Sequence, residues 1–196
     1  MMRRSNVLCG LLLISAIASA GVETTCFAGG AETGRLSFSG AVEDSEFTGR
    51  FGDFKVDYCV PGGAGPAQGS IEVTVDLASA DSDNADRDQT LKGPEFFAVD
   101  RHPRAEWRST AIEQAGSGYR ADGELTLKAI TRSQPIRFTL SSDGADLMAR
   151  GEFTLAGTAE VDRQRFDIGT GDFADPEFVR NRVDVEFEVR LIAEAP

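Results

Sequence analysis

One stretch of the chain reads Val183-Asp184-Val185-Glu186-Phe187-Glu188-Val189-Arg190-Leu191, with apolar and charged side chains in strict alternation. A period of two is typical of a β-strand that buries one face and exposes the other to water. The same alternation recurs at residues 36–38, 54–60, 71–77, 105–109, 125–127, 136–140 and 153–161. Together these stretches predict about eight strands in an all-β, antiparallel sheet.

The apolar face of such a sheet has to be covered, either by a second sheet or by closure of the sheet into a barrel. A barrel of about eight strands has room for one small ligand. The alternation is interrupted at about residues 80–95, where an acidic segment runs to Gly93. Acidic residues suit the first turn of a helix and glycine suits its end, so a short helix is predicted there, between strands.

The first twenty residues resemble a secretory signal peptide. Arg3 and Arg4 precede an apolar run at 7–18, and Ala18-Ser19-Ala20 matches a small-residue cleavage site. The apolar run is too short for an ordinary transmembrane helix. We therefore expect cleavage of residues 1–20, an N-terminal tail at 21–33 and one domain at 34–196. The mature chain is expected to have no transmembrane segment and to be periplasmic or secreted.

Composition excludes several classes of function. The chain has 32 Asp and Glu against 20 Lys and Arg, a net charge of −12, which argues against a nucleic-acid partner. The one histidine, His102, excludes sites built from several imidazoles and lies beside no nucleophile motif. The acidic run at 81–88 lacks the ligand spacing of an EF-hand. We therefore expect no catalytic residues, no metal and no resident cofactor; the protein is predicted not to be an enzyme.

Two cysteines remain once the leader is removed with Cys9, namely Cys26 and Cys59. In an exported protein they can form a disulfide that holds the N-terminal segment to an early strand. The alternative is two separate thiols. The sequence leaves both open, because it does not show whether the two Cα atoms approach each other.

Several motifs occur in a recognisable order and spacing. They lie at residues 73–79, 87–97, 107–110, 123–132 and 163–169. Over about residues 34–193 the chain resembles the YceI-like family of lipid-binding or polyisoprenoid-binding domains. Three places depart from the family's pattern: Ala129 replaces a glycine, the segment 163–167 differs in charge and ends on Asp167, and Tyr58 with Cys59 replaces the usual strand residues.

The resemblance implies an extended antiparallel lipocalin-like β-barrel of about eight strands, with an apolar pore and a short helix near its mouth. It implies a secreted or periplasmic protein that sequesters or carries an apolar chain: a polyisoprenoid, a quinone tail, or a fatty acid or amide. It also suggests a homodimer. The segment 36–49 looks closest to relatives associated with membrane b-type cytochromes, and the alternative function is therefore a quinone-linked redox accessory to such a cytochrome. A hydrolase acting on lipid head groups would need a nucleophile and a base that the sequence does not offer.

The residues expected to contact the ligand follow from the inward positions of these strands. We predict that the apolar chain contacts Val56, Tyr58, Val73, Val75, Phe96, Phe97, Trp107, Leu125, Leu127, Phe138, Phe153 and Phe187. Arg87 and Lys92 lie close in sequence to the pair Phe96-Phe97 and could receive an anionic head group. The alternative is that Arg87 pairs with a carboxylate and anchors the helix.

Overall fold

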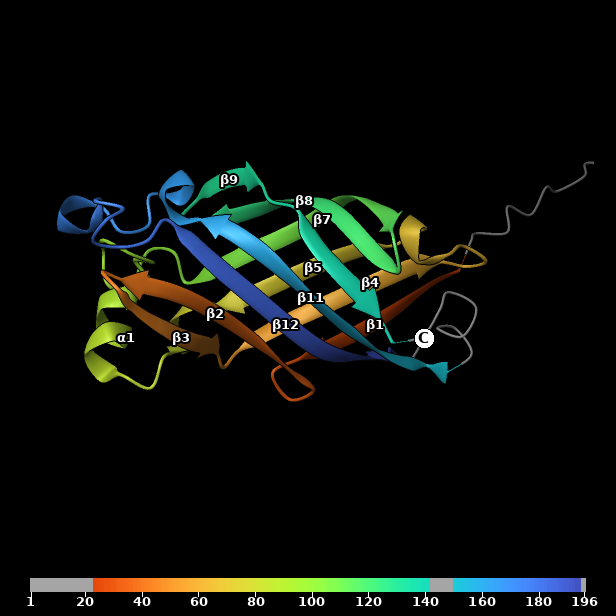
Figure 1. Cartoon of the computed structure of the whole chain (residues 1–196). Coiled ribbons are helices and arrows are strands. Elements are labelled where there is room, and N and C mark those ends of the chain that lie inside the picture. Colours follow the sequence, from red (N-terminus) through yellow and green to blue (C-terminus); the bar gives the residue numbers. More distant parts are fainter. Residues whose placement is uncertain (1–22, 142–149, 195–196) are drawn as a thin grey trace, which may run out of the picture.

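The computed structural model describes residues 23–141 and 150–194 (Figure 1). The expected signal peptide, residues 1–20, lies outside these ranges. Within them the chain is mostly β-structure with one short α-helix.

Eight strands form a closed antiparallel barrel, in which each strand pairs with the next and the last returns to the first. In spatial order they are β1 (Thr24–Gly30), β4 (Phe54–Pro61), β5 (Ser70–Asp76), β7 (Arg104–Ala115), β8 (Gly118–Leu127), β10 (Ile136–Leu140), β11 (Glu152–Asp162) and β12 (Arg182–Ala193). The ring closes where Phe27 of β1 lies opposite Ala193 of β12. The predicted all-β, eight-stranded barrel is confirmed.

Three further strands extend the sheet beyond this ring. Strand β12 pairs with β1 only through its last residues, and over 184–189 it pairs instead with β2 (Gly34–Val42). β2 continues into β3 (Ser45–Phe51), which pairs with the two-residue β6 (Ala80–Asp81). A fourth short strand, β9 (Ile130–Ser133), pairs with β8. The β2–β3 hairpin therefore widens the wall at one end of the barrel (Figure 1).

The α-helix α1 (Ala85–Lys92) lies at the widened end, which we call the helix end (Figure 1). Asn84 caps it by accepting a hydrogen bond from the main-chain N–H of Arg87, and Gly93 ends it, as predicted. Short 3₁₀-helices occur at η1 (Pro66–Gln68), η2 (Leu77–Ser79), η3 (Arg163–Phe166) and η4 (Gly171–Phe173). Among the described helices, none has both the length and the apolar composition needed to cross a membrane.

Strand β1 occupies a segment that the sequence assigned to an N-terminal tail, residues 21–33. It pairs with β4 along its whole length and with β12 at its centre. The sequence Thr24-Thr25-Cys26-Phe27-Ala28-Gly29-Gly30 has one large apolar side chain, and therefore shows no alternation. The barrel consequently begins earlier in the chain than the predicted residue 34.

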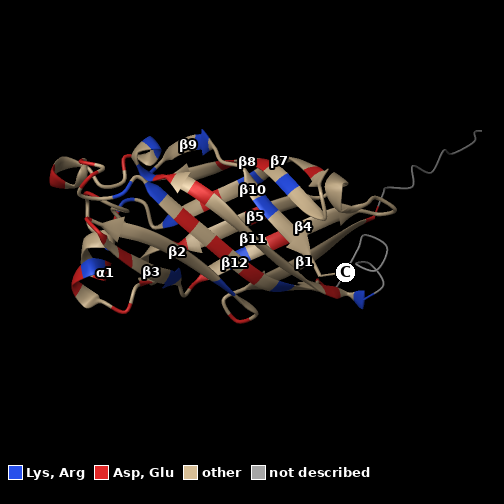
Figure 2. Ribbon diagram, viewed as in Figure 1, with Lys and Arg blue, Asp and Glu red and all other residues tan. Residues whose placement is uncertain are grey.

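The alternation of β12 has the orientation that the sequence predicts. Val189 and Leu191 are fully buried, whereas Glu188 and Arg190 are exposed. On the outer face Arg35 of β2 donates to Glu188 across 2.7 Å. Figure 2 shows acidic and basic residues distributed along the outer surface of β11 and β12. Exposed pairs of this kind contribute little to stability, but they keep the outside of the barrel polar.

Candidate ligand cavity

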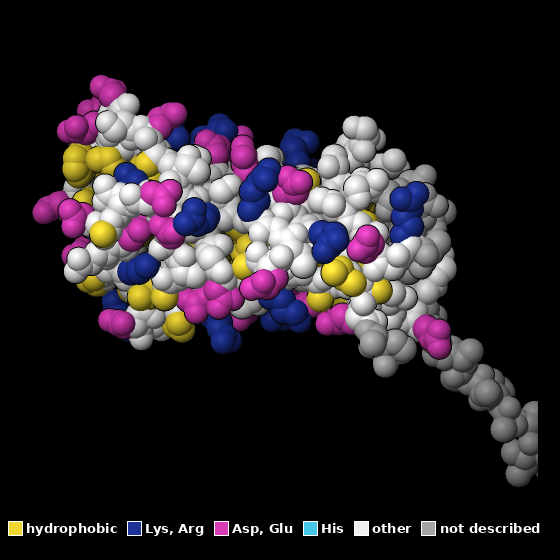
Figure 3. Space-filling model, turned by 90° about the horizontal axis from the view of Figure 1, so that it is seen from below, with side chains coloured by type: hydrophobic (Ala, Val, Ile, Leu, Met, Phe, Trp, Pro, Cys, Tyr) yellow, Lys and Arg dark blue, Asp and Glu magenta, His cyan; other side chains and the backbone are white. Residues whose placement is uncertain are grey.

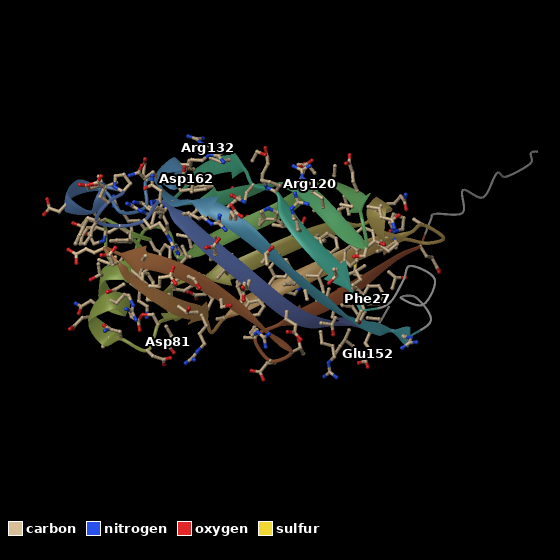
Figure 4. The ribbon with its side chains drawn as sticks, in the orientation of Figure 1. Phe27, Asp81, Arg120, Arg132, Glu152 and Asp162 are labelled. Carbon is tan, nitrogen blue, oxygen red and sulfur yellow. A yellow bond between two sulfur atoms is a disulfide. The ribbon has the colours of Figure 1, made fainter. Side chains whose placement is uncertain are left out.

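The end of the barrel opposite α1 is filled by side chains. We call it the disulfide end, because Cys26 and Cys59, which face each other on β1 and β4, form a disulfide there. Inside it, Phe27 and Phe153 meet edge to face with their ring centroids 4.9 Å apart. Figure 4 places Phe27 near Glu152 at this end, far from Asp81 and Asp162. Of the two alternatives for the cysteines, the structure contains the bridge.

Tyr58 completes the packing of the disulfide end. Its ring meets Phe153 at 5.8 Å, and its buried hydroxyl donates to the main-chain oxygen of Pro66 across 2.6 Å. Burial raises the pKa of the Tyr58 hydroxyl, so the group stays protonated and remains a donor. This residue is therefore part of a packed plug.

An apolar cavity of about 230 Å³ occupies the rest of the barrel and extends to the helix end. Its wall is formed mainly by aliphatic and aromatic side chains from nearly every strand, from α1 and from the segment 96–97. Several wall positions carry small residues, among them Ala41, Ala105 and Ala159. Small side chains on a widened sheet leave unfilled space, which explains why the cavity lies at this end.

Most of the residues predicted to contact a ligand do line the cavity. They are Val56, Val73, Val75, Phe96, Phe97, Trp107, Leu125, Leu127 and Phe187. Three predicted residues do not: Tyr58 and Phe153 belong to the plug, and the ring of Phe138 stacks on Tyr119 at 5.3 Å. All three point inward, but at their levels the barrel interior is filled.

Trp107 is the one tryptophan of the chain, and a glycine makes room for it. A Cβ atom on Gly123 of the neighbouring strand β8 would lie 2.3 Å from the Trp107 ring. The indole Nε1–H donates to the main-chain oxygen of Gln134 across 2.8 Å. The ring is therefore held against the wall of the cavity, with its one polar group satisfied.

Arg87 and Lys92, predicted at the head-group end, do not line the cavity. Arg87 donates to both the hydroxyl and the main-chain oxygen of Ser82, at 2.8 Å each, and its guanidinium lies 4.6 Å from the centre of the Phe47 ring. Asp88 accepts from the same Ser82. Arg87 thus anchors the start of α1, but through Ser82, whereas the sequence suggested a carboxylate partner.

Arg163 is buried at the helix end, and the motif at 163–169 that contains it did not reveal its role. All five of its N–H donors are directed at main-chain oxygens, namely those of Ile168, Gly169, Phe173, Val179 and Arg180. Burial lowers the pKa of Arg163. This side chain holds residues 163–180 together as the rim of the cavity.

Arg180 also lines the cavity, and its guanidinium is held by acids. It lies 2.9 Å from Glu46 and 3.9 Å from Asp184. The surface at the helix end shows hydrophobic side chains interspersed with acidic ones (Figure 3). Both arginines of the cavity wall therefore already have their partners within the protein.

Gln134 is a third polar residue of the cavity wall, and no sequence motif pointed to it. It follows β9, in a segment where that strand leaves the barrel wall, and it is only 4 % exposed. Among the described residues, no group of three or more His, Cys, Asp or Glu side chains is placed to hold a metal ion.

Comparison with known proteins agrees with this architecture. The sequence model of the YceI-like domain matches residues 30–191. A UPF0312 protein of Photorhabdus laumondii is 31% identical over 108 residues, which cover 54% of this chain and 56% of that protein. The chain thus spans about half the length of such curated relatives.

Two solved structures share the fold. BcnA of Burkholderia cenocepacia superposes with a TM-score of 0.71 at 26% identity, covering 80% of this chain and 95% of BcnA. A polyisoprenoid-binding domain from Saccharophagus degradans, implicated in plant cell wall breakdown, superposes with a TM-score of 0.64 at 12% identity, covering 88% of this chain and all of that domain. At that lower identity the likeness concerns the fold alone.

Proposed function

The chain belongs to the YceI-like family, and on that premise we propose that it is a binding protein for an apolar lipid chain, which it holds in the cavity at the helix end. The observation that carries this proposal is the composition of the wall, which consists of aliphatic and aromatic side chains apart from Gln134, Arg163 and Arg180. The solved relative named for polyisoprenoid binding supports the same class of ligand.

The driving force is the removal of hydrocarbon from water. Burial stabilises a complex by about 0.8 kcal/mol for each methylene group, so an apolar chain binds well without ionic contacts. No bond is made or broken, and a wall of this kind supplies neither a nucleophile nor a general base. We therefore propose carriage or sequestration, with no catalysis.

The volume of the cavity bears on the length of the chain that fits. At about 230 Å³ it is smaller than the roughly 300–1,000 Å³ that is usual for small-molecule sites. A long polyisoprenoid or quinone tail would therefore extend beyond the mouth or displace wall side chains. A fatty alcohol, acid or amide of moderate length fits with less rearrangement.

The test is native mass spectrometry of protein purified without detergent, followed by extraction and identification of the bound lipid. A matched pair of variants on β11 tests the site: Ala159→Leu adds volume inside the cavity, and Ala156→Leu adds the same volume on the outer face. We expect bound lipid in the wild type and in Ala156→Leu, and less in Ala159→Leu. Protein that is empty and takes up no alcohol, fatty acid, amide, quinone or isoprenoid would contradict the proposal.

The proposed location is the periplasm or the exterior of the cell, reached through the signal peptide. N-terminal sequencing of protein exported by a bacterial host tests this directly. We expect the mature chain to begin at Gly21. A chain that retains Met1 in the cytoplasm would contradict the proposed location and leave the lipid site untouched.

A further inference from the structure

We propose that Gln134 recognises the head of the ligand, and that the ligand is uncharged and carries an O–H or N–H donor, as a long-chain alcohol or a primary amide does. This inference rests on the proposed function, because it names the ligand class of the same cavity. The reason is that the other polar side chains of the cavity wall, Arg163 and Arg180, are already bound by protein groups, whereas the side-chain oxygen of Gln134 is not.

The main chain at Gln134 is fixed on both sides. Its N–H donates to the oxygen of Gly123 across 2.8 Å, and its carbonyl oxygen accepts from the Trp107 indole across 2.8 Å. The side chain crosses to β11, where Nε2 donates to the oxygen of Glu160 at 3.0 Å, and a second bond reaches the oxygen of Pro135 at 3.1 Å. The carboxamide is therefore held in one position.

These two contacts also assign the nitrogen and the oxygen of the carboxamide. Main-chain carbonyls only accept, so the nitrogen has to face Glu160 and Pro135 and the oxygen has to point elsewhere. Its two side-chain hydrogen bonds both come from Nε2, and Oε1 accepts no hydrogen bond from a described residue. Gln134 is 4 % exposed as a residue and lines the cavity, so Oε1 is an acceptor on a buried cavity wall that has no partner among the described residues. When an apolar ligand displaces water, this oxygen needs a donor from the ligand.

The same wall disfavours an anionic head group. Every N–H of Arg163 is engaged by a main-chain oxygen, and Arg180 is engaged by Glu46 and Asp184. A carboxylate or phosphate would enter an apolar space without an unengaged cation, and it would face the acceptor Oε1 of Gln134. Burying a charge in that way is strongly unfavourable.

A matched set of ligands tests the inference on the wild-type protein. Dodecanol, its methyl ether and dodecanoate share one chain and differ in their heads: a donor, an acceptor alone, and an anion. Binding to delipidated protein at pH 8 is followed by the fluorescence of Trp107, the single tryptophan, which lines the cavity. We expect dodecanol to bind roughly 10-fold more tightly than the ether, since an unpaired buried acceptor has a cost of this order, and dodecanoate to bind more weakly than dodecanol.

A variant then assigns the preference to Gln134. Gln134→Met keeps a similar side-chain length and removes the acceptor. We expect the alcohol and the ether to bind this variant equally, with the affinity for the ether unchanged or improved. Gln114→Met, an exposed position on β7, is the control and should keep the preference of the wild type. Circular dichroism checks the fold of each variant; if Gln134→Met does not fold, the ligand series on the wild type decides alone.

The outcomes separate the two proposals. If the wild type binds the alcohol and the ether equally, or binds dodecanoate best, the role of Gln134 is refuted and lipid binding stands. A Gln134→Met variant that keeps the preference for the alcohol refutes the role as well. If none of the three ligands binds and the extracted protein is empty, the lipid site itself is refuted.

Discussion

The disulfide end and the helix end of this barrel share most of their strands, yet one is filled by side chains and the other encloses a cavity. The interior of the disulfide end is filled by three aromatic rings in edge-to-face contact, those of Phe27, Tyr58 and Phe153. At the helix end, β2 and β3 widen the wall, and small residues such as Ala105 and Ala159 leave space behind them. An inward-facing side chain is therefore a core residue or a binding residue according to the local width of the barrel.

The largest expected effect is on the free energy of unfolding, and it should differ between substitutions at the two ends. Phe153→Ala removes a ring that is buried in the plug, and we expect it to lower the free energy of unfolding by about 3–5 kcal/mol. Phe187→Ala removes a half-buried ring that already borders empty space, so its cost should be less than half as large. Urea denaturation measures both. Equal losses would show that the two ends are packed alike.

The disulfide gives the next effect. Replacing both Cys26 and Cys59 with serine should lower the free energy of unfolding by about 2–4 kcal/mol, mainly because the unfolded chain gains freedom. The affinity for the ligand should be unchanged, because the bridge lies on β1 and β4 at the end away from the cavity. Denaturation with and without a reductant supplies the control, since the double variant should not respond to it. A loss of ligand affinity would show that the ends are coupled.

The fold was predictable where the sequence is periodic. The alternating stretches became β2, β4, β5, β7, β8, β10, β11 and β12, and the acidic segment before Gly93 became α1. Strand β1 was missed because it has one large apolar residue, Phe27, followed by an alanine and two glycines. Its place in the barrel comes from pairing with β4 and β12, which are distant in sequence, and local patterning does not reveal such contacts.

A smaller effect concerns the turn between β8 and β9, at the helix end. Lys128 and Ala129 both have positive φ, 51° and 61°, a conformation that glycine adopts more readily. Ala129 stands where the family's pattern has glycine, so Ala129→Gly should raise the free energy of unfolding by about 0.5–1 kcal/mol. Urea denaturation measures it. Lys128→Gly is the contrasting variant: it relieves the same backbone strain but also removes the hydrogen bond from Nζ to the main-chain oxygen of Asp167, so it should gain less stability. A lower free energy of unfolding in Ala129→Gly would contradict the prediction.

The smallest effect depends on pH. The main-chain N–H of Asp83 and then the Arg50 guanidinium hold the pKa of Asp81 below its ordinary value of 3.8. A depressed folded pKa means that the carboxylate stabilises the protein above pH 3.8, and that this contribution is lost as the pH falls through the folded pKa. Asp81→Asn should therefore melt slightly below the wild type at pH 7 and equally with it in stronger acid. A difference that grows on acidification would contradict the assignment.

The site was less predictable than the fold. Alternation identifies which side chains point inward, and nine of the twelve predicted apolar residues do line the cavity. It does not reveal how wide the barrel is at each level, so Tyr58, Phe138 and Phe153 could not be separated from them. Gln134 escaped notice because a glutamine before a proline resembles an ordinary turn residue, and its partners Glu160 and Trp107 lie far away in sequence.

The pairing of β12 has a consequence for when the protein becomes functional. This strand, the last of the twelve described strands, pairs with β11, β1 and β2 and so joins the final part of the barrel to its first. Contacts between residues this far apart in sequence form slowly, because a long loop has to close first. A growing chain therefore has no closed cavity until β12 arrives, and the proposed lipid binding would have to follow closure of the barrel, late in folding.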